Sequence, residues 1–267
     1  MRAGTRNGQG FVAGSLIGTL GGLIGLGGAE FRLPVLVGLF RLGTLEAVIL
    51  NKAMSLVVVA TALLFRGSTL SPTILADHLD VVFNLLAGSL VGAWWAAGRV
   101  ITLPRQRLNR IVLALLIGLS LIMLSEAWTG GHGGGTPLLE AGPLRFVAGL
   151  LAGLGIGMMA ALLGVAGGEL LIPTIVLLYG LDIKLAGSLS LMVSLPTMIA
   201  GFARYSRADA FDVLRQEQPL MRWMVAGSIL GAALGGLLLG LVPTDQLMGL
   251  LGIVLLVSAI KTFQHTR

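Results

Sequence analysis

Two carboxylates lie in stretches of the chain that are otherwise apolar. Glu30 and Glu169 each follow a run of glycines and stand four positions before a proline, in segments 25–34 and 164–173. Burying an ionisable group in an apolar setting is costly, so each glutamate predicts a functional site. Three roles fit: capping or bracing a helix N-terminus, carrying a proton, or contacting a substrate. Because a carboxylate repels anions, an anionic substrate would require the protonated form.

The same two segments are not expected to form continuous helices. Glycine weakens a helix, and proline lacks the N–H that helical hydrogen bonding needs. We expect short helices over 33–42 and 169–180, whose N-termini direct free N–H groups at each break, where they can hold an anion. The residues predicted to break the helices are Gly25, Pro34, Gly164 and Pro173, and the glycines predicted to meet substrate are Gly27, Gly28, Gly167 and Gly168.

The two segments belong to an internal repeat. The shift from Glu30 to Glu169 is 139 positions, and without a gap it also aligns Ser55 with Ser194 and Pro104 with Pro243. Two copies of one unit in a very apolar chain indicate a membrane transporter with internal symmetry.

The composition supports a membrane environment. Of 267 residues, 55% are hydrophobic and only 11% are charged, and the mean hydropathy is +0.94. Soluble domains are about one-quarter charged, so lipid is the expected solvent. The absence of cysteine excludes disulfides and thiolate metal sites. The net charge of +6 does not indicate nucleic-acid binding, because basic loops follow from the positive-inside rule.

The apolar segments divide the chain into two equivalent parts. We predict a first transmembrane repeat over 1–128, a glycine-rich non-cytoplasmic linker over 129–143, and a second repeat over 144–267. The predicted helices are 9–28, 33–42, 47–65, 78–100 and 108–127, then 144–163, 169–180, 185–203, 218–241 and 246–263.

The distribution of basic residues favours five crossings in each half. With a cytoplasmic N-terminus, this count places fourteen of the 18 Lys and Arg residues on the cytoplasmic side and four on the other. Four crossings per half would separate the clusters at 99–110 and 204–222, against the positive-inside rule. The fold class is therefore an all-α integral membrane protein of two inverted-topology repeats, each with about five helices and a short, broken second helix. Both termini are predicted to be cytoplasmic.

Other polar residues follow the breaks within apolar segments. Lys52 would attract an anion, although its side chain could instead extend to the membrane surface. Neutral donors near the breaks could bind substrate, or could bond carbonyl groups of their own or neighbouring helices. These candidate substrate-binding or coupling residues are Asn51, Lys52, Ser55, Ser188, Ser190 and Ser194.

The motif and the duplication together resemble the TauE/SafE family of sulfite and sulfonate exporters. The clearest stretch is Gly164-Val-Ala-Gly-Gly-Glu-Leu-Leu-Ile-Pro173, followed by Ala186-Gly-Ser-Leu-Ser190. The resemblance runs through both halves. It implies a small multi-pass permease for sulfite, sulfonates or related organic anions, and it implies export.

The predicted function is therefore that of a secondary transporter in the bacterial cytoplasmic (inner) membrane. It would move a small anion by alternating access around the paired breaks, each half gating against the other, with protons as a candidate coupling ion. The alternatives are an anion channel, a membrane-embedded enzyme or a non-transporting membrane protein. We expect no enzyme activity, cofactor, bound metal or nucleic acid, and a homo-oligomer is compatible with the sequence.

Overall fold

The computed structural model describes residues 3–24, 28–67, 76–129, 137–181, 183–206 and 212–237, with a few positions between 249 and 260. Within these ranges the chain is helical and contains no strand, which confirms the all-α class. The helices are α1 (Ala3–Ile24), α2 (Ala29–Gly38), α3 (Thr44–Gly67), α5 (Leu79–Val100), α6 (Arg105–Thr129), α7 (Pro143–Leu163), α8 (Gly168–Tyr179), α9 (Ile183–Ser206), α10 (Asp212–Gln216) and α11 (Gln218–Leu237).

Several of these helices have the length and composition of membrane spans. In the described residues, four are long and apolar enough to cross a bilayer: Thr44–Leu63, Leu79–Val100, Pro143–Leu163 and Leu185–Tyr205. At 1.5 Å per residue each covers the hydrocarbon thickness of about 30 Å. The protein is therefore of the multi-pass membrane class that the composition predicts.

The short second helix of each half is present. In the second half, α8 spans Gly168–Tyr179, close to the predicted 169–180. In the first half, α2 spans Ala29–Gly38, so the predicted 33–42 is wrong by four residues at each end. The error came from treating Pro34 as a boundary, whereas α2 begins directly after Gly28.

The two prolines are not the breaks that the sequence predicted. Pro34 lies inside α2 and Pro173 lies inside α8, each at the sixth helical residue. A proline removes the hydrogen bond to the carbonyl four residues earlier, which here belongs to Glu30 or Glu169. In each copy the proline therefore donates no hydrogen bond to the carbonyl oxygen of the motif's own glutamate.

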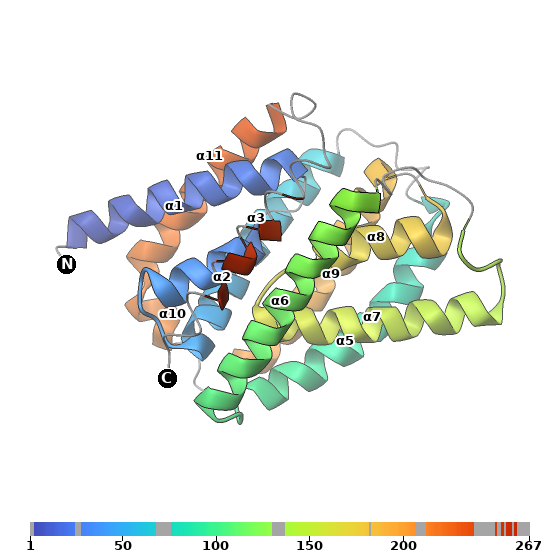
Figure 1. Ribbon diagram of the computed structural model, residues 1–267, viewed down its shortest axis with the longest axis horizontal. Coiled ribbons are helices and arrows are strands. Elements are labelled where there is room, and N and C mark those ends of the chain that lie inside the picture. Colours follow the sequence, from blue (N-terminus) through green and yellow to red (C-terminus); the bar gives the residue numbers. More distant parts are fainter. Residues whose placement is uncertain are drawn as a thin grey trace.

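The closest helix pairs each take one helix from each half. The pair α1 and α11 lies side by side at one end of the molecule, and the pair α5 and α7 at the other (Figure 1). A shift of 139 positions converts α1 into α7 and α5 into α11, so the two pairs are equivalent. The halves consequently interlock and do not pack as separate bodies.

Glycines make this close approach possible. A Cβ added at Gly18 would lie 2.3 Å from the carbonyl oxygen of Ser228, and one at Gly157 would lie 2.1 Å from that of Ser89. Gly18 and Gly157 are equivalent, as are the two serines. Small residues let helix backbones meet in a membrane, where packing replaces the hydrophobic driving force.

The equivalent helices α1 and α7 run in opposite directions in Figure 1. An inverted repeat requires such opposite directions, and the inverted relation between the halves stays a prediction. The orientation of each half relative to a membrane stays a prediction, as does the placement of both termini on the cytoplasmic side.

Around this frame the short helices are held near the middle of the fold. The equivalent helices α3 and α9 pack against each other, α2 packs on α3, and α8 packs on α9. Most of α2 is buried, including both of its charged residues, Glu30 and Arg32. This arrangement places the glycine-rich breaks beside α3 and α9.

Candidate functional site

The backbone of each break requires glycine. Gly28 and Gly167 are equivalent, and both have the left-handed conformation, with φ of 67° and 82°. Gly164 has φ of 68°, and a Cβ there would lie 2.2 Å from the carbonyl oxygen of Val48 in α3. Residues other than glycine rarely adopt this conformation, so these glycines end or begin helices here. Gly25 and Gly27 lie outside the described residues.

One side chain from α3 connects the two breaks. The Asn51 Nδ2 donates to the carbonyl oxygen of Ala29, the first residue of α2, at 2.9 Å. It also donates to the carbonyl oxygen of Leu163, the last residue of α7, at 3.2 Å. Carbonyls at a helix C-terminus lack intrahelical donors, so Asn51 satisfies one of these groups. Ala29 and Leu163 border the two breaks, so the breaks lie close together at Asn51, which is fully buried.

The other half does not reproduce this bridge. The equivalent of Asn51 is Ser190, whose hydroxyl donates to the carbonyl oxygen of Gly187 in its own helix at 2.8 Å. The two halves therefore contribute unequally to the centre, and the first supplies the connecting amide.

Lys52 is buried in protein beside the C-terminus of α7. Its side chain has no exposed surface, and its Nζ lies 3.5 Å from the carbonyl oxygen of Ala160 and 5.8 Å from the centre of the Tyr205 ring. The negative end of a helix dipole stabilises a cation there. A side chain extended to the membrane surface does not fit this burial, so that alternative is wrong.

Tyr205 and Gly201 shape the space around the ammonium group. The Tyr205 hydroxyl donates to the carbonyl oxygen of Ala161 at 2.6 Å, next to the Lys52 contact. A Cβ at Gly201 would lie 2.8 Å from the Lys52 Nζ, so the absent side chain leaves room for the cation. We did not predict either residue from the sequence. Tyr205 is one of two tyrosines in the chain, and its place in an apolar segment was the available signal.

The first glutamate is buried with a second cation on the same helix. Glu30 and Arg32 are both fully buried on α2. The N-cap of α2 is Gly28, which has no side chain, and Glu30 lies in the first turn, where a carboxylate interacts favourably with the helix dipole. Glu169 occupies the equivalent backbone position in α8, and its side chain lies outside the described part of the structure.

The predicted serines differ in their hydrogen bonds. Ser55 and Ser194 are equivalent and nearly fully buried, and within the described residues neither hydroxyl has a hydrogen-bond partner. Ser190 bonds its own helix, as stated above, and Ser188 is buried with a partner. Buried hydroxyl groups without partners are costly, so Ser55 and Ser194 are suited to a bound ligand or water.

The space beside the second break is small. A cavity of about 10 Å³ lies against Ala160, Leu163 and Gly167. A cavity of that size holds about one water molecule. Binding of an oxyanion at this point therefore requires the surrounding helices to separate.

Within the described residues, no three His, Cys, Asp or Glu side chains are grouped so that they could hold a metal ion. Asn51 and Lys52, adjacent on α3, both contact carbonyl oxygens at the C-terminal end of α7, and α2 contributes the buried pair Glu30 and Arg32. Buried donors and cations at the ends of broken helices suit an anion.

A comparison with protein families matches nearly the whole chain. The family model described as Sulfite exporter TauE/SafE covers residues 2–123 and 148–267. The chain belongs to the TauE/SafE family. The two matched ranges fall on the two halves of the repeat. No curated protein and no solved structure matches the chain. Membership makes this a multi-pass membrane protein of a transporter family.

Proposed function

We propose that this TauE/SafE member is a secondary transporter that carries a small anion, such as sulfite or a sulfonate, across the bacterial cytoplasmic membrane. The observation that carries the proposal is the Asn51 bridge between the two breaks, with the fully buried Lys52 as its neighbour. Burying a cation in an apolar helix bundle is costly unless an anion offsets its charge.

The anion would bind where the two breaks meet. Lys52 and Arg32 supply positive charge, and the Ser55 and Ser194 hydroxyls supply neutral donors. The N-termini of α2 and α8 add partial positive charge to the same region.

We further propose that Glu30 and Glu169 couple transport to protons. The centre contains an acceptor for the proton of a carboxyl group, because the Asn51 Oδ1 is buried and receives no hydrogen bond from any described residue. A protonated carboxyl does not repel the anion, whereas a carboxylate does. Binding of anion and proton together keeps the net charge of the buried site nearly constant.

The moving bodies are expected to be the mixed helix pairs. The sequence suggested that each half gates against the other, but α1 is locked to α11 and α5 to α7 by glycine contacts. Two bodies, one built on each pair, could rock around α3 and α9 while keeping those contacts. Alternating access would then open the Asn51 region first to one side and then to the other.

The test is transport by the purified protein in proteoliposomes. A carrier shows uptake of labelled sulfite that saturates, and accelerates when unlabelled sulfite is present on the far side. Flux that neither saturates nor accelerates would identify an anion channel. A panel of sulfite, sulfonates and carboxylates should also be tested. If no anion enters proteoliposomes faster than it enters vesicles without protein, the protein does not transport them and the proposal is refuted.

A further inference from the structure

A second polar site lies away from the breaks, at the end of the molecule where α5 and α7 begin and α8 ends. A pocket of about 520 Å³ is lined there by Asp80, Asn84, Arg145 and Tyr179, with Phe83 and Phe146 as apolar walls. None of these residues belongs to the candidate site described above. The volume is within the usual range of ligand pockets, which is about 300–1,000 Å³.

The floor of this pocket is a polar pair with unused hydrogen-bonding capacity. The Asn84 Nδ2 donates to the Tyr179 hydroxyl oxygen at 2.8 Å. Asn84 is 6% exposed, and within the described residues its Oδ1 receives no hydrogen bond. The structure also records no described acceptor for the Tyr179 hydroxyl proton, so that proton can be donated to a ligand.

Gly149 on α7 packs directly against the Asn84–Tyr179 pair. A Cβ at Gly149 would lie 2.2 Å from the Tyr179 hydroxyl oxygen and 2.5 Å from the Asn84 Nδ2. Any larger residue on α7 at this point would displace both groups. The pair therefore occupies space that this glycine keeps open.

Positive charge borders the pair on one side. The Arg145 guanidinium lies 5.4 Å from the centre of the Tyr179 ring and, among the described residues, forms no ion pair. It stands in the first turn of α7, which has no acidic residue and no side-chain cap, so the dipole of α7 adds to its charge. Asp80 stands in the first turn of α5, where the dipole of that helix offsets its charge.

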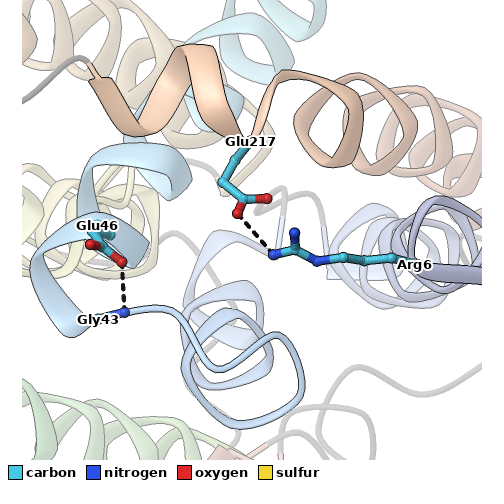
Figure 2. Close-up of polar contacts among 4 residues, drawn as sticks. All are labelled: Arg6, Gly43, Glu46 and Glu217. Atoms are coloured by element: carbon cyan, nitrogen blue, oxygen red, sulfur yellow. Dashed lines mark hydrogen bonds and ion pairs between the residues drawn. The ribbon is translucent and has the colours of Figure 1, made fainter. Parts of the chain in front are cut away.

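The equivalent position in the other half provides an internal comparison. Arg145 corresponds to Arg6, which forms an ion pair of 2.9 Å with Glu217 (Figure 2). Asn84 corresponds to Trp223, whose ring packs edge-on against Phe11 with 6.1 Å between ring centres. At that end the arginine is neutralised and an indole replaces the amide. Of these two equivalent positions, the one on α7 combines an arginine that has no ion pair among the described residues with the polar pair.

We propose that this pocket binds an organic oxyanion, with the charged head group at Arg145 and Tyr179 and an apolar portion against Phe83 and Phe146. An inorganic anion alone would fill little of the volume, which is why the ligand requires an apolar part. The head group could belong to a free carboxylate or sulfonate or to an anionic lipid, because both present the same oxygen atoms.

The test uses a single thiol as a reporter. The chain has no cysteine, and Gly142 lines the pocket with no atom within 4 Å of an added Cβ, so Gly142→Cys introduces one accessible thiol. In detergent, benzenesulfonate should slow maleimide labelling of this thiol in a saturable way, and the uncharged benzenesulfonamide should not. In nanodiscs, phosphatidylglycerol compared with phosphatidylcholine tests the lipid source. Protection in either arm supports the site and identifies the source.

Matched variants decide the chemistry. Arg145→Gln should weaken protection about tenfold, which is the loss of about 1.4 kcal/mol of binding free energy. Arg145→Lys should retain most of it, Asp80→Asn should strengthen it, and Arg6→Gln at the equivalent position should leave it unchanged. The proposal is overturned by an absence of protection in both arms, by protection that persists in Arg145→Gln, or by weaker protection in Asp80→Asn, because removal of a nearby carboxylate should relieve repulsion of an anion.

The test of this pocket can fail or succeed independently of the test of transport at the central site. Lys52→Gln alters the centre and leaves the pocket untouched, so protection of the introduced thiol should be the same in that background. Loss of protection in Lys52→Gln would mean that benzenesulfonate acts through the central site, and would refute a separate pocket.

Discussion

Removal of the Asn51 amide tests whether the two breaks are held together by this side chain. Asn51→Ala deletes two hydrogen bonds, to the carbonyl oxygens of Ala29 and Leu163, and leaves both acceptors buried. Hydrogen bonds between membrane helices contribute about 0.6 kcal/mol each on average and about 1.7 at most. The two bonds together predict a loss of about 1–3 kcal/mol in the free energy of unfolding.

The assay is equilibrium unfolding in mixed micelles with increasing dodecyl sulfate, followed by the fluorescence of the four tryptophans. Ser190→Ala is the matched control, because it removes a hydroxyl at the equivalent position that bonds only its own helix. The control is expected to change stability by less than about 0.5 kcal/mol. If Asn51→Ala and Ser190→Ala unfold at the same denaturant concentration as the parent, Asn51 does not hold the breaks together.

Three further predictions follow from the same geometry. Lys52→Met removes the buried cation and should raise the KM for anion uptake about tenfold, or about 1.4 kcal/mol; an unchanged KM in initial-rate measurements would exclude Lys52 from the binding site. Glu30→Gln removes a titrating group and should flatten the dependence of uptake on pH, whereas a pH profile identical to that of the parent would exclude Glu30 as a proton carrier. Gly157→Ala places a Cβ 2.1 Å from the Ser89 carbonyl oxygen and should cost about 1–3 kcal/mol in the same unfolding assay. Gly155→Ala, on the same helix with no atom within 4 Å, should be neutral or stabilising, and equal effects of the two substitutions would contradict the close packing of α5 and α7.

The local pattern of the sequence predicted the helices well. Long apolar runs and glycine clusters located most helix ends within about four residues, because both signals act over one or two helical turns. Pro34 misled the prediction because the break is made by glycines in the left-handed conformation. Pro34 is the sixth residue of α2 and lies near its start, where its missing N–H removes a single hydrogen bond of the helix.

The tertiary features could not be predicted in the same way. Glycines at 88, 92, 227 and 231 indicate helix contact faces, but they do not specify that α5 meets α7 and α11 meets α1. The Asn51 bridge includes a hydrogen bond to Leu163, which lies 112 positions further along the chain. The burial of Lys52 depends on Gly201 and Tyr205, which come from a helix in the other half. Each of these depends on how the halves interlock, which no local pattern records.

The central claim is that the two halves face opposite ways and meet at their breaks. Its most direct measurement is sided labelling of single thiols at equivalent helix starts, Gly4→Cys on α1 and Pro143→Cys on α7, in intact cells and in inverted vesicles. Both positions are exposed, and the chain has no other cysteine. The account predicts that an impermeant maleimide labels the thiol on α7 only from outside the cell and the thiol on α1 only from the cytoplasmic side. Labelling of both thiols from one side would contradict it.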